Sequence, residues 1–338
     1  MSNIAIDLGT ATVMIYVEGK GIVLSEPSVA AYDAKTGELF SAGKEAAGMM
    51  GRAPESIVVV RPMMDGVISD YSVTEQMLRY FLSKVRRHNI FKPQVMACVP
   101  SVITSVDQRT IVEVIHRTGA KRVCLIEEPV AAAIGAGIDV SKPHGCMVVD
   151  IGGGTTDIAV ISMGASVIKK SIKVAGASFD EAIARFVRRE YSVTIGRLTA
   201  EDIKIRVGCT FPQKTVDTMV AKGVNFVTGY PEEFEINSKQ VFLSLQEPLT
   251  AIMDAVQDVL EQTPPELIAD IMHDGILMTG GGSKLSGLDK LIEWKTGVAT
   301  RVADDAEYCV VLGTGKALAH IKEYPDGDRE DLSADEAY

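Results

Sequence analysis

Apolar residues recur along the chain in two spacings, which separate predicted helices from predicted strands. After Ser72 the spacing is three and four residues, which predicts a helix with one buried face. The residues of that face are Val73, Met77, Leu78, Phe81, Leu82 and Val85. Sequences of the form S/T-x-x-E/Q, typical of helix N-termini, begin at Ser72, Ser105, Ser178 and Thr263. Short apolar runs of strand character lie between them, and this alternation predicts a mixed α/β architecture.

Two distant segments share one plan, NIAIDLGTATVMIYV at residues 3–17 and CMVVDIGGGTTDIAVIS at residues 146–162. Each contains an apolar strand, an aspartate, an apolar residue, a turn of glycine and threonine, and a second strand. Each is therefore predicted to be a β-hairpin with an aspartate near its tip. Because a strand rather than a helix follows the glycines, and the turn lacks Gly-Lys-Ser/Thr, neither a dinucleotide-binding fingerprint nor a P-loop is present.

The composition of the two turns suits a phosphate ligand. Glycines let backbone amides approach an anion closely, and threonine hydroxyls add uncharged donors. Two such tips facing one another would hold a polyphosphate from both sides. Asp7 and Asp150 would then lie close to the phosphates, which requires a cation between them. A largely hydrated Mg²⁺ that touches one or two carboxylates meets that requirement.

Three further features add to this picture. Gly280, Gly281 and Gly282 follow the strand-like GILMT and precede the helical SGLDKLIEW, which predicts a turn facing the base and ribose of a nucleotide. A fourth glycine cluster, GTGKAL from Gly313, is predicted to open the last helix. Glu128 stands between a strand and a helix that Pro129 opens, so it is a candidate to orient a water towards a terminal phosphate. The alternative is that Glu128 caps its own helix.

Length, charge and cysteine usage exclude several other classes. The 338 residues suffice for about two domains, and no apolar run approaches the roughly 18 residues of a membrane span. The five cysteines and five histidines are scattered, so a zinc site or a Ser/His/Asp triad is not predicted. A net charge of −11 argues against binding of nucleic acid. We expect no cleavable signal at the N-terminus, and we expect the acidic residues 325–338 to be a disordered tail.

The chain resembles the MreB family of bacterial actin homologues, and in detail its Mbl branch. The motifs that carry the resemblance run in order from IDLGTA through GKGIVLSEPSV, RPMMDGVISDY, EEPVAAAIGAG, VVDIGGGTTDIAVISMG, TAEDIKI, TPPELIADI and TGGGSKLSGLDKL to GTGKAL. The resemblance implies an actin-like ATPase fold, with duplicated ribonuclease-H-like domains in two lobes around a cleft for ATP or ADP and Mg²⁺. Lobe I is implied at 1–145, with a small subdomain inserted at 31–63. Lobe II is implied at 146–311, with a small subdomain inserted at 182–245. A C-terminal helix at 312–324 is implied to pack back on lobe I.

The resemblance also assigns roles by position. The first phosphate turn is Gly9, Thr10, Ala11 and Thr12, and the second is Gly152, Gly153, Gly154 and Thr155. Asp7 and Asp150 face the metal through water, and Glu128 with Thr156 positions the attacking water. The nucleoside contacts are Glu201, Lys204, Gly280, Gly281 and Gly282. The sequence departs from the family pattern at Thr12 (usually Asn), Arg197 (usually Glu), Leu198 (usually Arg) and Asp157 (often Glu).

The implied function is that of a cytoskeletal ATPase, whose filaments are antiparallel pairs at the inner face of the cytoplasmic membrane. With transmembrane proteins of the elongation machinery, they organise cell-wall growth and rod shape. Ile90 and Phe91, set among basic residues, are predicted to contact the membrane, and the alternative is that they pack into the core. Two other functions of the superfamily were weighed. A sugar or acetate kinase needs a substrate pocket for which no insertion is seen, and an Hsp70-like chaperone needs a peptide-binding domain where only the acidic tail follows.

Overall fold

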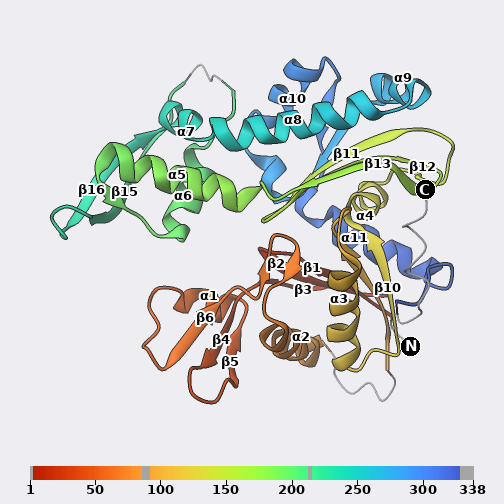
Figure 1. The fold of residues 1–338 in the computed structure, drawn as a ribbon, viewed down its shortest axis with the longest axis horizontal. Coiled ribbons are helices and arrows are strands. Elements are labelled where there is room, and N and C mark those ends of the chain that lie inside the picture. Colours follow the sequence, from red (N-terminus) through yellow and green to blue (C-terminus); the bar gives the residue numbers. More distant parts are fainter. Residues whose placement is uncertain (1–2, 86–91, 212–214, 328–338) are drawn as a thin grey trace.

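Two five-stranded sheets with the same strand order form the framework of the protein (Figure 1). The structure is a computed structural model and describes residues 3–85, 92–211 and 215–327. The first sheet has the order β3 (Gly21–Pro27), β2 (Thr12–Val17), β1 (Ile4–Leu8), β9 (Gln94–Val99) and β10 (Arg122–Glu127). The second has the order β13 (Ala165–Ile172), β12 (Thr156–Ser162), β11 (Cys146–Ile151), β17 (Ile276–Thr279) and β18 (Thr300–Val302).

The strand directions also match between the two sheets. In each sheet the first three strands are antiparallel neighbours, and the last two are added in parallel. The equivalent central hairpins are β1–β2 and β11–β12, which are the two segments that share one sequence plan. The predicted duplication is therefore present in the topology. We call the part built on the first sheet lobe I and the part built on the second sheet lobe II.

Each lobe carries a smaller three-stranded sheet away from its large sheet (Figure 1). In lobe I it consists of β4 (Ala30–Asp33), β5 (Leu39–Ala42) and β6 (Ile57–Val60), with α1 (Lys44–Met49) against it. In lobe II it consists of β14 (Val193–Thr194), β15 (Thr218–Asn225) and β16 (Pro231–Asn237), with α6 (Arg197–Val207) and α7 (Ser238–Ser244) nearby. A two-stranded ribbon, β7 (Met63–Met64) and β8 (Val67–Ile68), leads back from the small sheet of lobe I. The limits of the inserted subdomains, 31–63 and 182–245, stay predictions.

Two helices fill the space between the large sheets. Residues of α4 (Glu128–Gly135) and α11 (Cys309–Ala317) belong to one buried cluster together with residues of β1, β9, β11 and β12. A Cβ atom on Gly313 would overlap the carbonyl oxygen of Ala131, so glycine is required where α11 crosses α4. The GTGKAL cluster thus lies inside the last helix as a packing feature, and the prediction that it opens this helix was wrong. The helix predicted at 312–324 begins at Cys309 instead and ends at Ala317, followed by a short 3₁₀ turn at Leu318–His320.

The remaining helices cover the outer faces of the sheets. Lobe I has α2 (Tyr71–Val85) and α3 (Ser105–Arg117), and lobe II has α5 (Gly176–Tyr191), α8 (Gln246–Gln262), α9 (Pro265–Asp274) and α10 (Leu288–Thr296). No helix among the described residues is long and apolar enough to cross a bilayer.

The predicted capping sequences lie near four of these helix starts but miss the capping residue. The Asp70 side chain, rather than Ser72, accepts a hydrogen bond from the first turn of α2, and Thr104, rather than Ser105, caps α3. The residues before α5 and α9 are Ala175 and Pro264, so Ser178 lies inside the first turn and Thr263 lies outside it. At α2 and α3 a polar residue one or two positions before the predicted serine binds the free amides of the first turn instead. The four-residue pattern does not show which of the two residues caps the helix.

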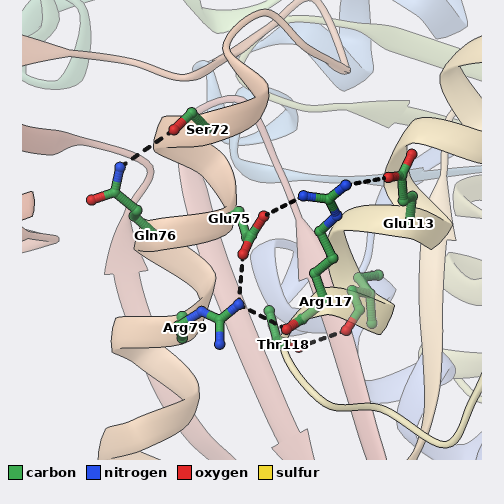
Figure 2. A network of polar contacts seen from close by, with 8 residues as sticks. Ser72, Glu75, Gln76, Arg79, Glu113, Arg117 and Thr118 are labelled. Carbon is green, nitrogen blue, oxygen red and sulfur yellow. Dashed lines mark hydrogen bonds and ion pairs between the residues drawn. The ribbon is translucent and has the colours of Figure 1, made fainter. Parts of the chain in front are cut away.

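A surface network joins α2 to α3 (Figure 2). The Arg79 guanidinium donates to Glu75 at 2.6 Å and to the Arg117 carbonyl at 2.8 Å, and Arg117 donates to Glu113 at 2.9 Å. These exposed pairs each contribute little free energy but fix the relative position of the two helices. Residues 86–91, which follow α2, lie outside the described residues, so the membrane contact of Ile90 and Phe91 stays a prediction.

Candidate functional site

The tips of the two central hairpins have the same backbone geometry. In lobe I the amide of Gly9 donates to the Thr12 carbonyl at 3.1 Å, and in lobe II the amide of Gly152 donates to the Thr155 carbonyl at 2.9 Å. Each turn is closed by one hydrogen bond across three residues, directly after the strand that carries Asp7 or Asp150. The duplication therefore extends to the turns that the sequence singled out.

The two tips lie against one another. A Cβ atom on Gly153 would be 2.5 Å from the Cβ of Ala11, and one on Gly154 would be 2.6 Å from the Thr10 hydroxyl. Real side chains are not found at such distances, so glycine at these two positions is what lets the tips meet. Thr10 also accepts a hydrogen bond from the Gly66 amide at 3.0 Å.

The tips present amides that the protein itself does not use. Among the described residues, the amides of Thr10, Ala11, Gly153 and Gly154 donate no hydrogen bond, whereas the carbonyls of Gly152 and Gly153 accept from the first residues of α5. Free amides gathered at one place, with the neighbouring carbonyls turned away, form a site for an anion. Facing tips supply such amides from both lobes.

Asp7 and Asp150 lie at the base of the two tips, each beside one polar neighbour. The Cys98 thiol donates to Asp7 at 3.3 Å, and the Thr279 hydroxyl donates to Asp150 at 2.6 Å. Burial raises the pKa of Asp7 to about 6. The pKa of Asp150 is raised to about 7, mainly by burial and also by the charges of Asp157 and Asp7, while the hydrogen bond from Thr279 acts in the opposite direction. The ionised form of each carboxylate is therefore unfavourable in this environment, and a bound cation would stabilise it.

Glu128 is the first residue of α4 and lies near the same group of acids. Burial holds its pKa well above the ordinary range, and the charges of Asp157, Asp7 and Asp150 act in the same direction. Its neighbour Glu127 is engaged elsewhere, with Lys169 and Ser166 at 2.6 Å each. Of the two adjacent glutamates, Glu128 is therefore the one that belongs to the site.

The arrangement fits a hydrated divalent cation. Among the described residues, no three Asp, Glu, His or Cys side chains converge as direct metal ligands. Mg²⁺ commonly keeps several waters and binds through one or two carboxylates together with phosphate oxygens. Asp7 and Asp150, with their raised pKa values, are the residues that would hold such an ion, and its charge would offset their repulsion.

Thr156 and Asp157 follow the second tip and are both fully buried. The Thr156 hydroxyl donates to the Val174 carbonyl at 2.6 Å, so its oxygen retains acceptor capacity only, and its role with a water stays a prediction. Asp157 accepts two hydrogen bonds from Ser101 of lobe I, from the amide and the hydroxyl, at 2.8 Å each. The sequence did not indicate Ser101, because its importance arises only where β9 ends beside β12.

Lys204 and Glu201 lie on α6, close to the second tip. The Lys204 ammonium is 2.7 Å from Asp180 and donates to the Gly176 carbonyl at 3.1 Å. It is therefore anchored to α5 rather than paired with Glu201. Burial and the charge of Arg197 lower the pKa of Arg61 of lobe I, against the charges of Glu201 and Asp180, so Arg61 lies within electrostatic range of α6.

Comparison with known proteins identifies the family. The family model described as MreB/Mbl protein matches residues 1–326. The chain belongs to the MreB/Mbl family. It is 49% identical over 324 residues to the cell shape-determining protein Mbl of Bacillus subtilis, covering 96% of this chain and 97% of that protein. It is 47% identical over 326 residues to the cell shape-determining protein MreB of Escherichia coli, covering 95% of this chain and 94% of that protein.

A solved structure supports the same assignment. The crystal structure of MreB5 of Spiroplasma citri bound to ADP superimposes with a TM-score of 0.91 at 38% identity, covering 95% of this chain and 97% of that one. The predicted actin-like fold is thereby confirmed. Identities of 49% to Mbl and 47% to MreB are too similar to separate the branches, so the placement on the Mbl branch stays a prediction.

In this MreB/Mbl chain the third glycine cluster stands beside Asp150. Gly280 adopts a φ of 80°, and a Cβ there would overlap the Ile151 carbonyl, while one on Gly282 would be 2.5 Å from the Ile151 side chain. Gly281, the first residue of the 3₁₀ turn Gly281–Lys284, faces open space. Gly280 and Gly282 therefore serve the packing of this turn on β11, and Gly281 is the member free to approach a ligand.

Sequence reasoning missed two charged residues beside the site, Arg61 and Asp180. Arg61 is part of RPMMDGVISDY, which was used only as a family motif, and its position within electrostatic range of α6 requires the fold. Asp180 is 4% exposed, and a carboxylate so buried needs a partner, which Lys204 supplies. A buried charge cannot be recognised from the sequence of an amphipathic helix alone.

Proposed function

We propose that this protein binds ATP or ADP with Mg²⁺ between its lobes and hydrolyses ATP. The observation that carries the proposal is the pair of facing tips, whose unused amides lie next to Asp7 and Asp150. Free amides suit the phosphates, and the two carboxylates suit the cation. The MreB5 relative, bound to ADP, supports a nucleotide ligand in this fold.

Most of the predicted residues have a role in this proposal, and Gly280 and Gly282 support it through packing. The turns at Gly9–Thr12 and Gly152–Thr155 donate to the phosphates, and Gly281 with Glu201 and Lys204 lies towards the nucleoside. Mg²⁺, when bound, neutralises charge that develops on the phosphate oxygens. Glu128 in its ionised form accepts a hydrogen bond from the water that attacks the terminal phosphate, and Thr156 helps to place that water.

We further propose that the protein assembles into filaments that determine cell shape, because the Mbl and MreB relatives are cell shape-determining proteins. Head-to-tail assembly needs two different complementary surfaces. The small sheet of lobe II exposes apolar side chains that suit one of them, namely Val220, Val224, Phe226, Val227 and Tyr230. Pairing into antiparallel double filaments, attachment to the inner face of the cell membrane, and contact with transmembrane proteins of the elongation machinery belong to the same proposal.

Sedimentation and electron microscopy test assembly directly. We expect pelleting and visible filaments with ATP and Mg²⁺, and a Val227→Asp variant is expected to lower the pelleted fraction while retaining nucleotide binding. Lys222→Gln, an exposed polar change on β15 before the turn that carries Val227, serves as the matched control. Monomers under all conditions of salt, lipid and Mg²⁺ would refute filament assembly.

A lipid monolayer tests the membrane contact. Filaments of wild type are expected to bind the monolayer, and the double variant Ile90→Ser with Phe91→Ser is expected to release them. Unchanged binding in the double variant would remove these two residues from the proposal. The kinase alternative is not favoured, and a panel of sugars and acetate with labelled ATP should yield free phosphate without a phosphorylated product.

A further inference from the structure

One buried carboxylate of lobe II takes its hydrogen bonds from lobe I. Asp157 on β12 is 0% exposed, and its Oδ1 accepts from the amide and the hydroxyl of Ser101 at 2.8 Å each. Ser101, 3% exposed, lies just beyond the end of β9. Two donors on one oxygen stabilise an ionised carboxylate, and both would be lost if the lobes moved apart.

The position of Asp157 connects this contact to the proposed chemistry. In the hairpin register Asp157 is paired with Asp150, so the two side chains leave the sheet on the same face. The same carboxylate thus lies opposite a residue proposed to hold the cation and also touches the other lobe.

Two further polar contacts between the lobes, within the part of the chain that the structure describes, differ in kind. Glu127 meets Lys169 and Ser166, and Asp65 lies 3.9 Å from Lys173, but these charged side chains are all partly exposed to water. Water replaces the partner of an exposed ion at little cost, whereas a buried carboxylate that loses its donors is destabilised strongly. Of these polar contacts, the one between Ser101 and Asp157 should therefore cost most to break.

We propose that Ser101 and Asp157 form an interlobe latch, in which the hydrogen bonds hold the lobes closed and thereby keep the two hairpin tips together. Both are positioning residues that act on the reaction through lobe closure. The effect on hydrolysis rests on the proposed ATPase function. The effect on lobe closure does not, because the two hydrogen bonds join groups of the protein only.

Lobe closure is measured on the nucleotide-free protein by electron paramagnetic resonance between two spin labels. Lys35→Cys in the small sheet of lobe I and Thr228→Cys in that of lobe II are exposed attachment sites, and the five native cysteines are buried. Ser101→Ala removes one hydrogen bond to a charged group and is expected to raise the ratio of open to closed molecules roughly tenfold. Ser41→Ala is the matched control, because this buried serine donates to Glu45 within lobe I. It should leave the ratio unchanged.

The Asp157→Asn variant provides the second measurement. Its side chain keeps an oxygen that can accept from Ser101 but carries no charge. Hydrogen bonds to an ionised group are roughly twice as strong as those between neutral groups. Asp157→Asn is therefore expected to raise the ratio of open to closed molecules in the same direction as Ser101→Ala.

The outcomes separate the two proposals. If Ser101→Ala leaves the distance distribution of the nucleotide-free protein like that of Ser41→Ala, the latch is refuted, whatever the enzyme activity. If Asp157→Asn folds, as judged by its thermal unfolding, and its distance distribution coincides with that of wild type, the contribution of the Asp157 charge to the latch is refuted. Wild type that binds no nucleotide and hydrolyses no ATP would overturn the proposed function, and the distance measurement would still decide on the latch.

Discussion

Replacing Asp150 by asparagine should stabilise the nucleotide-free protein at neutral pH. The difference between a pKa of about 7 in the folded protein and the ordinary 3.8 corresponds to about 4 kcal/mol. The folded protein keeps this proton over a pH range where the unfolded chain has lost it, so the free energy of unfolding falls as the pH rises from about 4 to about 7. Asparagine cannot ionise, yet its oxygen still accepts from Thr279. Because Asp157 and Asp7 share the repulsion, we expect a gain of about 2 to 4 kcal/mol at pH 8.

Urea unfolding of wild type and variant at pH 8 and pH 5, with a chelator present, measures this gain. At pH 5 Asp150 is already largely protonated in the folded protein, so the gain should shrink to about 1 kcal/mol. Asp180→Asn is the matched control, since it breaks the 2.7 Å pair with Lys204 and should destabilise by about 2 kcal/mol or more. If the Asp150→Asn variant is no more stable than wild type at pH 8, the ionised Asp150 side chain does not destabilise the folded protein, and the reasoning is refuted. With Mg²⁺ and ATP added, the order should reverse, because the variant has lost a residue that holds the ion.

Three further substitutions test other parts of the molecule. Glu128→Ala should retain ATP binding but slow phosphate release at least tenfold in a phosphate-release assay, and unaltered turnover would remove Glu128 from the mechanism. Gly153→Ala, whose Cβ would be 2.5 Å from Ala11, should keep the tips apart and weaken nucleotide binding about tenfold or more by calorimetry, whereas wild-type affinity would mean that the tips need not meet. Gly313→Ala should lower the free energy of unfolding by about 2 kcal/mol in urea, because its Cβ overlaps Ala131, and a neutral result would contradict the tight crossing of α11 and α4.

The sequence sufficed for the parts of the site that follow from local backbone geometry. The hairpin around Gly9 and the hairpin around Gly152 were predicted from alternating apolar residues and a glycine turn, and both have the expected strands and turns. The strand order could not be predicted from the residues alone, since the partners β9 and β17 join from far along the chain. Family resemblance supplied that part of the fold.

Residues whose importance depends on a distant neighbour could not be predicted. Ser101 and Arg61 look like ordinary loop residues until the second lobe is placed against the first. The place of Gly313 was predicted wrongly because a glycine that allows two helices to touch is indistinguishable in sequence from one that opens a helix. The surroundings of a glycine decide between these functions, as the overlap with Ala131 shows.

The two central hairpins share one plan but differ in the residues that follow the turn. The tips have equal length, so Thr156 and Asp157 of lobe II correspond to Val13 and Met14 of lobe I, and in the registers Asp150 faces Asp157 where Asp7 faces Met14. The shared features, a closed glycine turn and free amides, suffice to hold a phosphate chain symmetrically. Hydrolysis needs a water on one side of the terminal phosphate only, and a symmetric clamp cannot provide that. The polar residues Thr156 and Asp157 break the symmetry, and the contact of Asp157 with Ser101 makes the asymmetric half of the site depend on closure of the lobes.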